Sequence, residues 1–179
     1  LTDSIGEVNY DLGHLFDFGV PDGNAGSVGN VCRDGFKGSA YTSHPFVDTT
    51  EIGAFLNDYF DIDFVAHEIG HQFGGYHTFS FETGVAGVNS EPGSGSTIMA
   101  YAGVTVEDNV QNHSDPYFHY NSIKNIQDYL ARNSCQVPTP ITNQPPHVSA
   151  GQEVSIPIGT AYTLEAIASD QDDDELNYG

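Results

Sequence analysis

The sequence predicts an α+β fold, because strand-like and helical patterns occupy separate stretches of the chain. Residues 10–16, reading YDLGHLF, alternate their side chains between two faces, which indicates a strand. From Phe60 onward apolar residues recur at the spacing of one helix face: Ile62, Val65, Ala66, Ile69 and Phe73. A second helical pattern leads into Cys135. We therefore expect a sheet with a few helices.

The segment from 19 to 38, between the strand and the first helix, is rich in Gly, Asp and Asn. Within it only AGSVGNVC can run extended, so we expect a short edge strand at about residues 25–31. Gly74 and Gly75 predict the end of the first helix, because glycine readily adopts the left-handed conformation that ends helices.

The second half of the chain begins with a loop rich in Gly and Ser, expected from 84 to 95, and the run STIMAYAG follows it. In the last helix Asn121 and Ser122 are candidate N-caps. Apolar residues recur behind them at helical spacing: Ile123, Ile126, Tyr129 and Leu130.

A change of amino-acid composition after Cys135 indicates a domain boundary. Four prolines lie between residues 137 and 146, which excludes a helix or a regular sheet there. Short strands are expected at 154–158 and 162–168. About 30 residues cannot supply the roughly seven strands of a β-sandwich, so the tail is expected to be the start of a truncated module. The expected divisions are a domain at 1–136, a Pro-rich linker at 137–147 and the module at 148–179.

The charge balance argues against two classes of partner. With 25 acidic and 4 basic side chains, the surface would repel nucleic acid and anionic lipid. No stretch reaches the roughly 18 to 20 apolar residues needed to cross a bilayer, so no membrane insertion is expected. The sequence begins at Leu1 rather than at an initiator Met, which suggests a piece of a longer precursor.

The two cysteines, Cys32 and Cys135, lack the close spacing of a thiolate metal site or a redox motif. A long-range disulfide is favoured, and it would imply an oxidising compartment, hence a secreted protein. Two buried free thiols are the alternative.

The stretch HEIGHQFGGYH, from His67 to His77, carries the chemistry. His67 and His71 are four residues apart on a helix, so both rings project from one face, as two zinc ligands require. Gly74 lets the chain leave the helix abruptly, and His77 can then supply a third nitrogen. Three neutral ligands with an open fourth position are typical of a catalytic zinc site, where the ion acidifies a bound water.

Glu68, between the first two histidines, is the candidate general base. It would take the proton of the attacking water and pass it to the leaving amine. The alternative interpretation of the motif is a histidine-rich surface helix.

HExxHxxGxxH followed by a methionine turn resembles the metzincin clan of zinc peptidases. The surroundings VAHEIGHQFGGYHTF, EPGSGSTIMAYAG and HSDPYFHYNSI resemble the bacterial secreted branch of reprolysin-like (adamalysin-related) peptidases, over about residues 1–136. The resemblance implies a secreted zinc endopeptidase acting on proteins or peptides. It also implies that Met99 forms an apolar floor beneath the histidines without binding the metal.

The resemblance carries three further structural expectations. Cys32 should pair with Cys135. The substrate should lie extended along the edge strand expected at 25–31, by β-augmentation. A complete metzincin domain has more sheet and helix than the residues before His67 can hold, so the N-terminal part of the domain is expected to be missing.

Two positions depart from the pattern of animal reprolysins. Thr78 stands where they usually have Asp, and Tyr101 follows the methionine at a position where they lack tyrosine. Tyr101 resembles the tyrosine of astacins and serralysins, which can bind zinc at rest and then stabilise the oxyanion. A packed tyrosine with a bonded hydroxyl is the other interpretation.

The remaining candidate groups are weaker. The other histidines lack ligand spacing and are expected to be structural or exposed: His14, His44, His113, His119 and His147. The acidic turn at Asp170, Asp172 and Asp174 spaces oxygens as Ca²⁺ sites do, although a solvated turn is favoured. The tail resembles the opening strands of cadherin-like or polycystic-kidney-disease-type modules.

Two other functions remain open. A non-catalytic adhesion protein could keep the peptidase scaffold, but the intact Glu68 argues against it. A pappalysin-type metzincin is the other, because HTF after the third histidine and a tyrosine after Met99 suit that branch too. Loops around residues 100–115 would shape the specificity pocket, and the oligomeric state is not encoded in any pattern.

Overall fold

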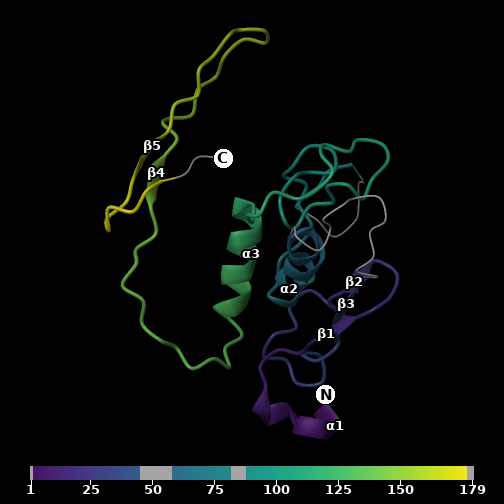
Figure 1. Ribbon diagram of the computed structural model, residues 1–179. Coiled ribbons are helices and arrows are strands. Elements are labelled where there is room, and N and C mark those ends of the chain that lie inside the picture. Colours follow the sequence, from purple (N-terminus) through teal and green to yellow (C-terminus); the bar gives the residue numbers. More distant parts are fainter. Residues whose placement is uncertain (1, 45–57, 82–87, 177–179) are drawn as a thin grey trace. The chain divides into compact units, whose positions relative to one another are not determined.

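A computed structural model describes residues 2–44, 58–81 and 88–176. They form two compact units, Leu1–Gln136 and Val137–Gly179 (Figure 1). The first unit combines helices with a small mixed sheet, so the predicted α+β class is confirmed. Part of the loop expected at 84–95 lies outside the described residues.

The sheet of the first unit has three strands in the order β1-β3-β2. β1 (His14–Asp17) runs parallel to β3 (Ala40–Ser43), and β2 (Asp22–Asn24) runs antiparallel to it. The strand expected at 10–16 starts four residues later, at His14; a short helix, α1 (Thr2–Ile5), and a 3₁₀ turn, η1 (Glu7–Asn9), precede it.

The edge strand expected at 25–31 was wrongly placed. It is β2, and the residues that follow it turn instead of extending, with positive φ at Gly26, Gly29 and Cys32. Their backbone N–H groups serve another element: those of Gly29, Asn30 and Val31 donate to the carbonyls of His71 and Gln72 at 2.8 to 3.1 Å. The segment thus caps the C-terminal end of a helix, where carbonyls lack intrahelical donors.

That helix is built in two parts. A π-helical stretch, η3 (Phe60–Ala66), continues directly into α2 (His67–Gln72), which packs against β3. The helix ends where Gly74 adopts φ +99°, as predicted. The expected apolar stripe from Ile62 to Phe73 is only half-buried, whereas the side bearing His67, Glu68 and His71 is buried.

The last helix, α3 (Tyr120–Leu130), confirms the second helical pattern, but its N-cap is His119. The His119 ring accepts a hydrogen bond from the Asn121 N–H at 3.1 Å, so Asn121 and Ser122 lie inside the helix. Beyond it, Cys135 forms the expected disulfide with Cys32. The bridge closes a loop of 103 residues, worth about 4 to 5 kcal/mol in the chain-entropy model.

The second unit contains an antiparallel pair, β4 (His147–Ser149) and β5 (Ile167–Ser169). Residues 154–158, expected as a strand, form none, and β5 overlaps only the end of the strand expected at 162–168. No strand is assigned to the residues between β4 and β5. Within the described ranges, no helix is long and apolar enough to cross a membrane.

Candidate metal centre

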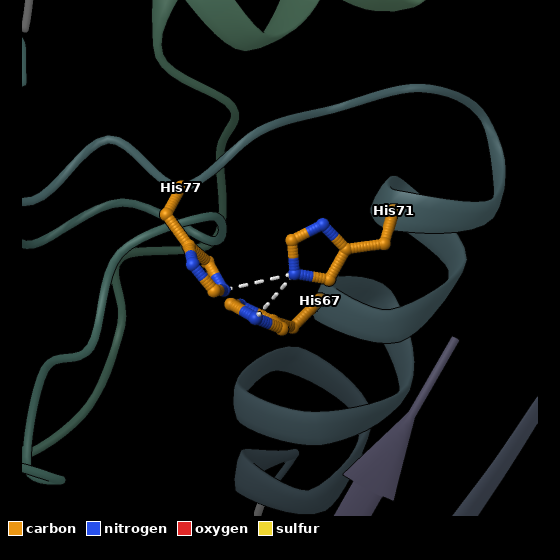
Figure 2. A group of neighbouring side chains, drawn as sticks. All are labelled: His67, His71 and His77. Atoms are coloured by element: carbon orange, nitrogen blue, oxygen red, sulfur yellow. Dashed lines mark hydrogen bonds between the residues drawn. The ribbon is translucent and has the colours of Figure 1, made fainter. Parts of the chain in front are cut away.

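Three histidine rings meet beside α2, as Figure 2 shows. The Nε2 atom of His71 lies 3.1 Å from Nε2 of His67 and 2.9 Å from Nε2 of His77. His67 and His71 come from successive turns of α2, and His77 returns to them after the chain reverses at Gly74. Ligand nitrogens around a tetrahedral zinc ion are about 3.3 Å apart, given Zn–N bonds of about 2.0 to 2.1 Å.

Hydrogen bonds to backbone carbonyls fix two of these rings. His67 Nδ1 lies 2.7 Å from the Ile98 carbonyl oxygen, and His71 Nδ1 lies 2.7 Å from that of Gly75. A carbonyl only accepts, so each Nδ1 must carry the proton. In the neutral rings both Nε2 atoms are then bare lone pairs facing each other, an arrangement that a cation between them would stabilise.

The surroundings keep the rings neutral. Burial, together with the neighbouring rings of His71 and His77, holds the pKa of His67 well below its usual value. Burial likewise lowers the pKa of His71, and burial with the adjacent His71 lowers the pKa of His77 to about 4. Metal ligands must be deprotonated, so the three residues fit a zinc ion on both geometry and charge.

Buried polar side chains fix the helix against the sheet. Gln72 is fully buried; its amide oxygen lies 2.8 Å from His14 Nδ1, and its amide nitrogen donates to the Gly13 carbonyl at 3.1 Å. The other nitrogen of His14 lies 2.7 Å from the Thr42 hydroxyl. His14 therefore has a structural role, linking α2 to β1 and β3.

A cleft of about 300 Å³ opens over the histidines, with residues 23–28 along its rim and Tyr101 on its wall. Glu68 also lines it and is 9% exposed. Burial raises the pKa of Glu68 to about 7, with a further contribution from Asp22, although a hydrogen bond from the Ala25 backbone opposes both. Gly23 is needed here, because a Cβ atom on it would lie 2.5 Å from Glu68 Oε1.

Met99 lies beneath the helix, fully buried. A Cβ atom on Gly70 would lie 2.3 Å from its sulfur, so methionine and helix backbone touch directly between the turns that carry His67 and His71. The Tyr101 ring lies 4.6 Å from the His77 ring and 5.6 Å from the His67 ring, measured between centroids.

The other histidines lie elsewhere. His113 Nδ1 is 2.7 Å from an Asp63 oxygen, His44 contacts the rings of Phe60 and Phe64, and His147 is exposed on β4. In the acidic turn the carboxylate oxygens approach within 4.8 Å, but hydrogen bonds inside the turn account for that: Asp170 accepts from the backbone N–H groups of Asp172 and Asp174.

Sequence patterns did not reveal several residues of the centre. The carbonyls of Ile98 and Gly75 carry no side-chain signal, and the buried Gln72 looks in sequence like an ordinary polar helix residue. Glu91, a buried carboxylate beside the segment leading to Met99, was also missed. The run EPGSGSTIMAYAG contains it, but nothing in a single sequence distinguishes a buried glutamate from an exposed one.

A family model described as metallo-peptidase family M12B, reprolysin-like, matches residues 1–129. No curated protein and no solved structure matches the chain significantly.

Proposed function

Because the chain belongs to the reprolysin-like family M12B of metallopeptidases, we propose that it is a secreted, zinc-dependent endopeptidase of the metzincin type. One observation carries the proposal: the bare Nε2 atoms of His67 and His71 converge with His77 at a single point, next to the buried Glu68. This combines a cation site with a proton acceptor in one cleft.

His67, His71 and His77 would hold the zinc ion. Bound there, zinc supplies Lewis-acid chemistry, polarising the scissile carbonyl and acidifying water. The carbonyls of Ile98 and Gly75 keep two of the rings in the orientation and tautomer that this requires.

Glu68 would act as the general base. Its place in the same cleft as the three histidines suits a group that must accept a proton from the attacking water and return it to the leaving amine. The Ala25 backbone hydrogen bond and the close approach of Gly23 keep the carboxylate on the side of the cleft where β2 runs.

The substrate would bind as an extended strand along β2. Among the residues that the structure describes, the order β1-β3-β2 places β2 at an edge of the sheet, and residues 23–28 line the cleft. Backbone hydrogen bonds to such an edge recognise a peptide in extended form without reading its side chains. Tyr101, close to His67 and His77, would stabilise the oxyanion in this proposal.

Two observations support a secreted enzyme. The Cys32–Cys135 disulfide is typical of oxidising compartments. The chain has 25 acidic and only 4 basic side chains, and dissolved ions in an extracellular medium would screen the resulting repulsion.

Zinc content and casein cleavage of the full chain, compared with those of Glu68→Gln, test the proposal. Wild type should bind one zinc and cleave, and a chelator should abolish cleavage. Glu68→Gln should keep its zinc while cleavage slows by about 10² to 10⁴-fold, the usual contribution of a general base. A wild type that holds zinc yet cleaves no protein or peptide would instead indicate a binding protein on a peptidase scaffold.

A further inference from the structure

A buried carboxylate outside the cleft, Glu91, binds the turn that precedes the Ile98 carbonyl. Glu91 is 7% exposed, and both of its carboxylate oxygens accept hydrogen bonds. Oε1 accepts from the backbone N–H groups of Ser96 at 2.9 Å and Thr97 at 3.1 Å, and Oε2 accepts from the Thr97 hydroxyl at 2.6 Å. The carboxylate thus accepts three hydrogen bonds from one short turn.

That turn leads directly into Ile98 and Met99. The Ile98 carbonyl accepts from His67 Nδ1, and Met99 lies against Gly70 between the helix turns that carry the first two histidines. Since Thr97 precedes Ile98 directly, a shift of residues 96 and 97 would move the carbonyl that accepts from His67.

The main chain of Glu91 binds the segment that follows the third histidine. Its N–H donates to the Thr78 carbonyl at 2.8 Å, and the Ser80 hydroxyl donates to its carbonyl at 2.7 Å. Thr78 in turn donates its N–H to the Met99 carbonyl at 3.2 Å. Glu91 therefore connects the segment that follows His77 with the 96–98 segment, whose Ile98 carbonyl binds His67.

The partners of the Glu91 side chain explain why a charged group is tolerated here. Burial would raise the pKa of Glu91, but hydrogen bonds from hydroxyl and backbone N–H groups outweigh it and hold the pKa below its usual value. Ionised, the carboxylate offers acceptors only, which is what three converging donors require. Gly95, with φ +70°, leaves room for it, since a Cβ atom there would lie 3.1 Å from Glu91 Cβ.

We infer that Glu91 is a positioning residue of the metal centre, which fixes the Ser96–Thr97 turn and, through the Ile98 carbonyl, the orientation of His67. The inference that this orientation serves zinc rests on the proposed function.

Two variants separate positioning from packing. Glu91→Leu removes both carboxylate acceptors at similar volume and keeps the main-chain carbonyl. Glu91→Gln keeps the shape and one acceptor for the two N–H groups, and its NH₂ group can donate to the Thr97 hydroxyl, so it should rescue most of the effect. Tyr129→Phe is the control, because it removes one hydrogen bond, from the Tyr129 hydroxyl to the Val31 carbonyl, and none of those that Glu91 or Ile98 makes.

The first measurement is the zinc affinity of the full chain, by competition with a chromophoric chelator, at a temperature where circular dichroism shows each variant folded. Loss of a group behind a metal ligand typically weakens metal binding by about 10 to 100-fold. Glu91 binds Thr97, the residue before Ile98, so Glu91→Leu should lower the zinc affinity by about 10-fold. The zinc affinity of Glu91→Gln should lie within about 3-fold of wild type, and that of Tyr129→Phe should match wild type. Folded Glu91→Leu with wild-type affinity would overturn the inference and leave the proposed function intact.

The second measurement needs no metal. In the metal-free protein, NMR should show the His67 Nδ1 proton as a slowly exchanging signal, because it is bound to the Ile98 carbonyl. The signal should be lost in Glu91→Leu and kept in Glu91→Gln and Tyr129→Phe. If wild type bound no zinc, the proposed function would fail, and this signal would still decide the role of Glu91: its persistence in Glu91→Leu refutes the inference.

Discussion

Replacing Gly70 by alanine should damage the protein, although this substitution usually stabilises a helix. Alanine is favoured over glycine inside a helix by about 1 kcal/mol. Here the new Cβ atom would lie 2.3 Å from the Met99 sulfur and 3.0 Å from Phe118 Cε1. Since non-bonded atoms pack at about 3.5 to 4.0 Å, the sulfur must move by at least about 1.2 Å, and Met99 is fully buried.

The size of the effect follows from those two opposing contributions. Overpacking of this kind costs about 1 to 3 kcal/mol, so Gly70→Ala should lower the free energy of unfolding by about 0 to 2 kcal/mol in spite of the gain in helix propensity. It should also weaken zinc binding, because the displaced methionine pushes on the turns that carry His67 and His71. Urea unfolding followed by circular dichroism, with a chelator competition for zinc, measures both effects.

A double-mutant cycle provides the control. Met99→Ala alone should destabilise by about 2 to 5 kcal/mol through the cavity that it leaves. Combined with Gly70→Ala, the loss should be smaller than the sum of the single losses, because the new methyl group enters vacated space. A Gly70→Ala protein more stable than wild type, with unchanged zinc affinity, would refute the contact between Gly70 and Met99.

Three further outcomes follow from the structure. Gly23→Ala should slow cleavage by about 10 to 100-fold without loss of zinc, because the new Cβ atom would lie 2.5 Å from Glu68 Oε1 and displace the base; equal steady-state rates would speak against this placement of β2. Changing both Cys32 and Cys135 to serine should lower stability by up to about 4 to 5 kcal/mol, seen as a thermal shift that reducing agent reproduces in wild type. The pKa of Glu91 is lowered by folding, so the stability that it contributes is present above its usual pKa of 4.5 and lost as the pH falls through the folded-state value. The free energy of unfolding should therefore fall less steeply with decreasing pH in Glu91→Gln than in wild type. Parallel pH dependences would contradict the lowered pKa.

The part of the site that depends on local spacing could be predicted from the sequence. Two histidines four residues apart share a helix face wherever the helix forms, and Gly74 ends that helix through its own backbone preference. The disulfide between Cys32 and Cys135 also followed, given the resemblance to a family. The shared helix face and the helix end depend little on how distant segments pack, whereas the disulfide joins residues 103 apart and was expected from the family resemblance.

The errors arise where a distant segment decides the local structure. Residues 25–31 look extendable, but their N–H groups are used by the end of α2, and β3 pairs with residues 22–24 instead. His119 caps α3 through a ring nitrogen, a role that helix-capping preferences assign to serine, threonine, aspartate and asparagine. The donors that surround Glu91 become visible only when the chain is folded.

The candidate ligands lie close together in the sequence, whereas a group that orients one of them lies far away in it. All three histidines lie between residues 67 and 77, whereas the carbonyl that orients His67 lies 31 residues further on. An unfolded chain therefore already holds the complete set of ligand atoms close together, and it would compete with the folded state for the ion. Zinc would then raise the free energy of unfolding by less than its affinity for the folded protein implies. The increase would equal the difference between the zinc affinities of the folded and the unfolded chain, which arises because the rest of the domain orders the ligands.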